Sequence, residues 1–231
     1  MRQLKIILDA DGVLCDFTSG ALRVVEEVTG RRFALSDVTK FDFVKALGLT
    51  LDEGRAVKQR IGSRQGFAAA LAPYPHARQG VRRLRELGEV CCVTSPWDSS
   101  PWWRDERTAW LALHFGIDRV HHAADKAPFE ADVFVDDEAA HVQAWSTRWP
   151  GRTAVLWRTP HNTPESAPRG AHATSSWDDL YQIALEVARG PRQGEFELVS
   201  TSMDVEYRGG VAVAFVPKID GGCGDPSEGA P

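Results

Sequence analysis

Residues 4–14 read LKIILDADGVL, and this stretch decides how the rest of the chain is interpreted. The run Leu4–Leu8 is short and mostly apolar, and Asp9, Asp11 and Gly12 follow it directly. A short apolar run that ends at an acidic turn with a glycine is typical of a buried parallel strand. The two carboxylates therefore follow the carboxyl end of this predicted strand, where they form either a turn with a helix N-cap or part of a catalytic site.

Predicted strands and helices alternate from about residue 77 onward. The predicted strands cover 89–94, 119–122, 131–135 and 153–157, and the predicted helices cover 77–87, 104–115, 138–148 and 177–188. Strands that alternate with helices imply a parallel sheet covered by helices on both faces. The sequence therefore predicts an α/β fold.

The residues between the first strand and this alternating region have a different pattern. They contain helical segments such as Leu51–Ile61 and no convincing central strand, and Pro73 and Pro75 close the stretch. We interpret it as a small helical cap inserted after the first strand. The predicted division is a catalytic core of residues 1–16 and 76–190, a cap of residues 17–75 and a tail of residues 191–231.

The tail has two further features. Residues 196–207 and 211–216 flank Arg208, Gly209 and Gly210, which is the pattern of a β-hairpin. The last residues, from about 220, are rich in Gly and Pro and are expected to be disordered.

Charge and composition limit the class of partner. The net charge of -5 argues against a nucleic acid polymer, because surfaces that bind one are usually basic. No apolar run is long enough to cross a membrane, and the N-terminus has no secretory signal. The four cysteines lack metal-ligand spacing, and free thiols fit a reducing compartment. We expect a cytoplasmic protein that acts on a small molecule, and whether it forms a homodimer stays open.

Further polar residues lie at or near the carboxyl ends of the other predicted strands: Thr94, Ser95, Lys126, Asp136 and Asp137. In an open parallel sheet these strand ends line one ligand crevice, so the residues are expected to meet Asp9 and Asp11 there. Each has an ordinary explanation alone, as a helix cap, a solvated lysine or a helix start. All of them in this order favour a catalytic site.

This set of residues fits magnesium-dependent phosphoryl transfer. Asp9 and Asp136 supply the hard oxygen ligands that Mg²⁺ prefers, and crowded carboxylates need a cation to neutralise their repulsion. Thr94 or Ser95 can hydrogen-bond a phosphoryl oxygen, and Lys126 places a positive charge on the phosphate. One carboxylate can then attack phosphorus as a nucleophile.

Asp11 can donate a proton to the leaving oxygen and later take one from water. The whole set resembles the four motifs of the haloacid dehalogenase superfamily, on Asp9–Leu14, Thr94, Lys126 and Asp136–Asp137. The resemblance implies a Rossmann-like core with the first strand central and an aspartyl-phosphate intermediate on Asp9. It also implies acid/base catalysis by Asp11, and Mg²⁺ held by Asp9, Asp136 and the backbone carbonyl of Asp11, with Asp137 in a supporting role. The aspartate at position 11 resembles the residue that the phosphatase branch of the superfamily carries at this position of the motif.

A closer resemblance, over roughly residues 4–187, is to the 5'(3')-deoxyribonucleotidases. It is carried by DADGVLCDF at 9–17, GFAAALAPYP at 66–75, TSP at 94–96 and WLALHFG at 110–116. It implies a phosphoric monoester hydrolase for (deoxy)nucleoside monophosphates, in which aromatic side chains of the cap hold the base.

The candidates for the substrate pocket are Phe17, Phe43, Phe67 and Trp97, although aromatic residues in a helical block also pack in cores. The segment 96–104 and the cap depart from the family pattern. A sugar phosphate or another small phosphomonoester therefore stays open as the substrate, and a catalytically silent binding protein is a third hypothesis. Base preference and the choice between 5' and 3' phosphates also stay open.

Overall fold

A six-stranded parallel sheet forms the centre of the protein, with strand order β3-β2-β1-β4-β5-β6. The computed structural model describes residues 1–162, 166–190, 205–208 and 211–214, in two compact units, Met1–Gly190 and Pro191–Pro231. The strands of the sheet are β1 (Leu4–Leu8), β2 (Gly88–Thr94), β3 (Val120–His122), β4 (Val133–Asp136), β5 (Thr153–Trp157) and β6 (His172–Thr174). The predicted α/β fold is confirmed, and β1 lies between β2 and β4.

Helices cover both faces of this sheet, because alternate residues of a strand point to opposite faces. Leu4, Ile6 and Leu8 of β1 pack in one hydrophobic cluster, and Ile7 packs in another. The helices that contribute to the first cluster include α4 (Ala77–Leu87), α5 (Trp103–Phe115) and α7 (Trp177–Arg189), and α6 (Ala139–Arg148) contributes to the second. Strands buried on both faces explain the nearly continuous apolar runs in the sequence.

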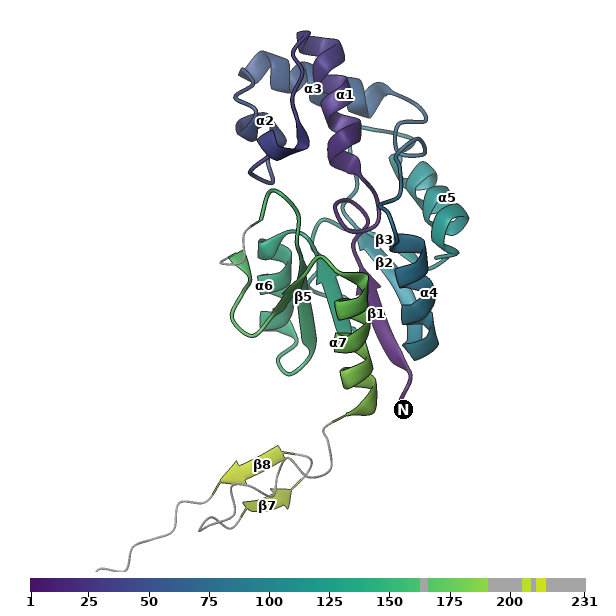
Figure 1. Cartoon of the computed structure of the whole chain (residues 1–231), viewed down its shortest axis with the longest axis vertical. Helices are drawn as coiled ribbons and strands as arrows, with labels where there is room; N and C mark the ends of the chain where they lie inside the picture. The colour runs from purple at the N-terminus through teal and green to yellow at the C-terminus, as the bar shows by residue number, and fades with distance from the viewer. Residues whose placement is uncertain (163–165, 191–204, 209–210, 215–231) are drawn as a thin grey trace, which may run out of the picture. The chain divides into compact units, whose positions relative to one another are not determined.

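The helices of residues 17–75 lie beyond the carboxyl end of β1 (Figure 1). They are α1 (Phe17–Thr29), the 3₁₀ turn η1 (Leu35–Asp37), α2 (Phe43–Ala46) and α3 (Leu51–Ser63). Helix α1 begins where the Asp16 carboxylate accepts a hydrogen bond from the Ser19 amide, and it ends at Gly30 with a φ of 69°. We keep the name cap for residues 17–75.

The cap enters and leaves through two extended segments that pair with each other. The Asp16 amide donates to the Ala72 carbonyl at 2.9 Å, and the Tyr74 amide donates to the Leu14 carbonyl at 2.9 Å. Cys15 and Pro73 form an antiparallel bridge between these bonds. The base of the cap is therefore fixed beside the turn that follows β1.

The predicted elements agree with the structure to within a few residues, with one strand missed. Strand β6 has only three residues, His172 and Ala173 are exposed, and it carries no apolar run to signal a strand. At Gly88, α4 passes directly into β2, and a Cβ atom there would lie 2.0 Å from the Leu4 carbonyl oxygen. Only glycine lets the two backbones approach this closely.

In the second unit, β7 (Val205–Arg208) pairs antiparallel with β8 (Val211–Ala214). The rest of the hairpin predicted over 196–216, and the disorder predicted after 220, lie outside the described residues and stay predictions. Among the helices that are described, none combines the length and the apolar character needed to cross a membrane.

Candidate active site

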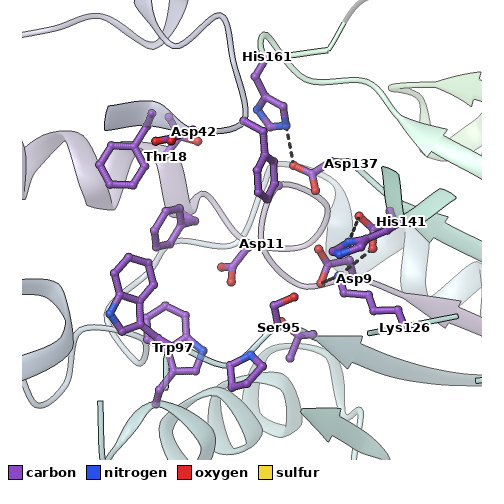
Figure 2. A pocket seen from close by; sticks show the side chains of 18 of the residues that line it. Asp9, Asp11, Thr18, Asp42, Ser95, Trp97, Lys126, Asp137, His141 and His161 are labelled. Carbon is purple, nitrogen blue, oxygen red and sulfur yellow. Dashed lines mark hydrogen bonds and ion pairs between the residues drawn. The ribbon is translucent and has the colours of Figure 1, made fainter. Parts of the chain in front are cut away.

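A pocket of about 630 Å³ lies where the carboxyl end of the sheet faces the cap. Of the eleven side chains proposed from the sequence, ten line it: Asp9, Asp11, Phe17, Phe43, Thr94, Ser95, Trp97, Lys126, Asp136 and Asp137. Figure 2 shows Asp11 between Trp97 on one side and Asp9 with Lys126 on the other. Residues far apart in the sequence are thus brought together by the parallel topology, as expected for strand ends.

The turn after β1 places Asp9 against the end of β4. The Asp9 amide donates to the Val135 carbonyl at 2.9 Å, and the Ala10 carbonyl accepts from the amides of Leu14 and Cys15. Gly12 has a φ of 80°, and a Cβ atom there would lie 1.8 Å from Oδ2 of Asp137. The glycine is required both for the backbone conformation and for this close approach.

Lys126 is held between two carboxylates. Its side chain is 1% exposed, and Nζ lies 2.9 Å from Oδ1 of Asp9 and 2.7 Å from Oδ2 of Asp136. Burial alone would lower the pKa of Lys126, but Asp9 and Asp136 more than offset this and raise it above its usual value. The ammonium group is therefore charged and fixed at the end of the sheet.

Three buried carboxylates are crowded at this point. Ligand atoms of Asp9, Asp136 and Asp137 all lie within 4.8 Å of one another. Burial raises the pKa of Asp9 to about 8; Lys126 opposes the shift, while Asp136 and Asp137 add to it. Burial also raises the pKa of Asp137 to about 6, although His161 acts in the opposite direction. A hard divalent cation would neutralise such a group, so the donor set fits Mg²⁺.

Asp136 and Asp137 differ in how their oxygens are used. Oδ2 of Asp136 binds Lys126, and its Oδ1 accepts from the Glu138 amide at 2.9 Å and faces Nδ1 of His141 at 3.3 Å. Burial opposes ionisation of Asp136, but Lys126 and His141 lower its pKa overall. Asp137 has one neighbour of this kind among the described side chains, His161, whose Nε2 lies 3.1 Å from Oδ2.

Two hydroxyl groups line the pocket at the carboxyl end of β2, those of Thr94 and Ser95. Thr94 is fully buried, and its Oγ1 has no hydrogen-bond partner among the described residues. Ser95 is half-buried and lines the same pocket. A buried hydroxyl without a partner is costly, so the orphaned Oγ1 of Thr94 fits a site that a ligand oxygen completes.

The structure adds functional candidates to which the sequence analysis gave no role. His141 and His161 line the pocket beside the acidic group, and Arg107 of α5 forms an ion pair with Asp11 at 2.6 Å. Arg107 looks like an ordinary helix-surface charge in the sequence. Its position four residues after Trp103 and three before Trp110 places it on the buried stripe of α5, and that spacing was the available signal.

Aromatic side chains form the opposite side of the pocket. The ring of Phe17 lies 5.8 Å from that of Trp97 and 6.2 Å from those of Phe43 and Trp103, between ring centroids. Phe67 is the one proposed residue that does not line the pocket; it is 6% exposed and stacks behind on Trp103.

Solved structures of low sequence identity share this fold. A haloacid dehalogenase-like hydrolase from Burkholderia xenovorans is 17% identical, with a TM-score of 0.54 over 77% of this chain and 97% of that one. L-2-haloacid dehalogenase from Xanthobacter autotrophicus, with chloropropionic acid covalently bound, is 13% identical, with a TM-score of 0.51 over 80% and 99%. These similarities confirm the expected haloacid dehalogenase-like fold.

Curated relatives are closer in sequence. The human cytosolic-type 5'(3')-deoxyribonucleotidase is 26% identical over 207 residues, which is 84% of this chain and 99% of that protein. The human mitochondrial 5'(3')-deoxyribonucleotidase is 29% identical over 196 residues, or 81% and 85%. A family model described as 5' nucleotidase, deoxy (pyrimidine), cytosolic type C protein matches residues 2–190. The chain therefore belongs to this nucleotidase family, with a haloacid dehalogenase-like fold, and it is a phosphoric monoester hydrolase.

Proposed function

We propose that the protein is a Mg²⁺-dependent phosphatase that hydrolyses deoxyribonucleoside monophosphates through an aspartyl phosphate on Asp9. The observation that carries the proposal is the buried group at the sheet end, where Asp9 is bonded to Lys126 next to the orphaned hydroxyl of Thr94. The names of the relatives support the substrate class, since both human proteins are called deoxyribonucleotidases.

The phosphate is held by groups that converge beside Asp9. The ammonium of Lys126 uses two of its N–H donors on Asp9 and Asp136, which leaves the third for a phosphate oxygen. Oγ1 of Thr94 and the hydroxyl of Ser95 supply further hydrogen bonds. Charge-assisted contacts of this kind are stronger than neutral ones and fix the phosphorus atom relative to the nucleophile.

Asp9 and Asp137 are the side chains that we propose for Mg²⁺, together with the backbone carbonyl of Asp11. The sequence analysis gave the ligand role to Asp136 and a supporting role to Asp137. The hydrogen bonds favour the reverse, because both oxygens of Asp136 are already used by Lys126, Glu138 and His141. When bound, the ion would neutralise the acidic group and polarise a phosphoryl oxygen.

The side chains then divide the reaction between them. A carboxylate oxygen of Asp9 attacks phosphorus, and the bond to the leaving oxygen breaks while Asp11 gives that oxygen a proton. In the second half a water molecule attacks phosphorus and gives a proton to Asp11, and the bond between phosphorus and Asp9 breaks. Phosphate leaves, and both aspartates return to their starting states.

Substrate choice belongs to the aromatic side of the pocket. Phe17 and Trp97 are half-buried and line it, so a flat base can lie against them. Stacking of this kind contributes roughly 1–3 kcal/mol per base. We also propose a cytoplasmic location, because the first human relative is of the cytosolic type.

A panel of phosphomonoesters assayed with Mg²⁺ tests the proposal. We expect dUMP or dTMP to be hydrolysed with a kcat/KM about 5- to 150-fold above that of glycerol phosphate or glucose 6-phosphate. If sugar phosphates prove better substrates by about tenfold, the protein is a phosphatase of another substrate class and the assignment to nucleotides is wrong.

A further inference from the structure

Arg107 and Lys126 are the two cationic side chains that the described part of the fold buries. Lys126 contacts the proposed nucleophile, whereas Arg107 is 0% exposed and contacts Asp11 from α5. A fully buried guanidinium is unusual unless it is paired, and among the described residues its one acidic partner is Asp11. The charge is therefore placed beside the proposed acid/base residue.

The contacts of Arg107 single out one oxygen of Asp11. Nη2 of Arg107 donates to Oδ1 of Asp11 at 2.6 Å, and Nη1 donates to Sγ of Cys15 at 3.0 Å. The Cys15 thiol itself donates to the same Oδ1 at 2.9 Å. Oδ1 thus accepts two hydrogen bonds, while Oδ2 has no partner among the described residues and belongs to a side chain that lines the pocket.

The guanidinium is itself held in place. Its central carbon lies 5.0 Å from the ring centroid of Trp103 and 5.4 Å from that of Trp110. Burial alone would lower the pKa of Arg107, but Asp11 and Cys15 more than offset this and raise it. A planar donor fork packed against aromatic rings loses little freedom when it binds a carboxylate, and it stays charged throughout.

We propose that Arg107 is a positioning residue for leaving-group protonation. Together with Cys15 it holds Oδ1 of Asp11 and so turns Oδ2 toward the leaving oxygen of the substrate; the proposal rests on the function proposed above. As the bond from phosphorus to that oxygen breaks, the proton on Oδ2 moves to the oxygen and yields the free alcohol. Asp11 becomes a carboxylate at that moment, and Arg107 lies against the new charge.

The dependence on the leaving group tests this role. A nucleotide leaves as a poor alkoxide and needs the proton, whereas p-nitrophenolate is a far better leaving group and needs it much less. We expect Arg107→Met to lower kcat/KM about 10- to 100-fold for dUMP and less than about 3-fold for p-nitrophenyl phosphate. Arg107→Lys should recover part of the loss on dUMP. The matched control, Arg104→Met on the exposed face of the same helix, should change neither value.

Two further variants separate positioning from folding. Cys15→Ala keeps the buried charge but removes one donor to Oδ1, and it should cause a smaller loss that is again confined to dUMP. In an Asp11→Asn background, Arg107→Met should cost less than about 2-fold on dUMP, because a residue that acts through Asp11 has nothing left to position.

Equal losses on both substrates, or full additivity with Asp11→Asn, would overturn the inference and leave Arg107 a structural residue. Circular dichroism and the Tm of each variant show whether it is folded, and a misfolded Arg107→Met leaves the decision to Cys15→Ala. There, a loss shared equally by dUMP and p-nitrophenyl phosphate would contradict the proposal. A wild-type protein that hydrolyses glycerol phosphate and p-nitrophenyl phosphate but no nucleotide would instead contradict the nucleotidase assignment, and a larger loss on glycerol phosphate than on p-nitrophenyl phosphate in Arg107→Met would still support the inference.

Discussion

The charged side of the pocket and its aromatic side are held by different kinds of interaction. The charged side (Asp9, Thr94, Lys126, Asp136 and Asp137) follows strand ends, is buried, and is fixed largely by hydrogen bonds and ion pairs of defined geometry. The aromatic side (Phe17, Phe43, Trp97 and Trp103) comes from the cap and from the segment after β2, and it is held by ring contacts.

Directional contacts tolerate little change, whereas apolar contacts are non-directional and allow side chains of similar size to replace one another. We therefore expect the register of the sheet to fix where the phosphate reacts. The cap could then vary without disturbing that chemistry, so that substrate choice is set separately from the reaction.

The largest effect should come from the nucleophile on the charged side. Asp9→Asn keeps the shape of the side chain but removes the attacking carboxylate, so kcat for dUMP should fall at least about 1,000-fold. Steady-state assays of the purified variant measure this. Asp105→Asn, the same change on an exposed residue of α5, is the control and should stay within about 2-fold. Activity near the wild-type level in a folded Asp9→Asn protein would remove Asp9 from the mechanism.

A second large effect should come from the buried ammonium. Lys126→Met should lower kcat/KM about 100- to 1,000-fold, because a fixed cation at the phosphate is lost. The matched control is Lys58→Met, since Lys58 lines the same pocket from the cap but is exposed. We expect at most a few-fold loss there. Similar losses for the two lysines would contradict the special role that we give to the buried cation beside Asp9.

On the aromatic side the effect should be one of selectivity. Phe17→Leu should reduce the preference for dUMP over glycerol phosphate by about 5- to 150-fold, the range that stacking on a base supplies. Rates with p-nitrophenyl phosphate should change less. Phe67→Leu alters the same aromatic cluster behind the pocket and should leave the preference intact. A preference lost equally in both variants would show that packing, and not contact with the base, sets it.

The smallest effect concerns stability and pH. The pKa of Asp9 is about 8 in the folded chain, against an ordinary value of 3.8. At a pH between these two values the carboxyl group of Asp9 keeps its proton in the folded state and loses it in the unfolded state. The free energy of unfolding of EDTA-treated protein should therefore fall as the pH rises from about 5 to about 8. Mg²⁺ binds the deprotonated carboxylates, so the rise in Tm that it causes should grow over the same range.

Thermal unfolding with and without Mg²⁺ measures this, and Asp9→Asn provides the reference because it cannot release that proton. The difference in Tm between wild type and variant isolates the contribution of Asp9 from that of other titrating groups. A metal-free wild type that becomes more stable than Asp9→Asn as the pH rises would contradict the crowding of carboxylates described above.

Much of the fold and of the charged side could be predicted because the residue types report their own environment. A short, mostly apolar run such as Leu4–Leu8, followed by acidic residues and a glycine, indicates a buried strand and its crevice. Strand β6 (His172–Thr174) gives no such signal, because it has only three residues and lies at the edge of the sheet. Its pairing with β5 is visible only in the structure.

Other parts of the site depend on distances that no linear pattern contains. Asp136 and Asp137 are the same residue type in the sequence, and the contacts of Asp136 with Lys126, Glu138 and His141 are the basis of the different roles that we propose for them. The spacing of Arg107 from Trp103 and Trp110 indicates that it is buried, but its contact with Asp11 depends on how α5 is placed in the fold. Phe67 belongs to the cap as Phe17 and Phe43 do, yet its ring stacks on Trp103 and does not line the pocket.

The covalent intermediate tests the central claim most directly. Protein mixed with dUMP and Mg²⁺ is quenched during turnover and treated with borohydride, which reduces an acyl phosphate to an alcohol, and the peptides are mapped by mass spectrometry. The account predicts that Asp9 is converted to homoserine, that Asp11 and Asp137 are unchanged, and that the conversion is absent without dUMP. Reduction of another carboxylate, with Asp9 unmodified, would contradict it.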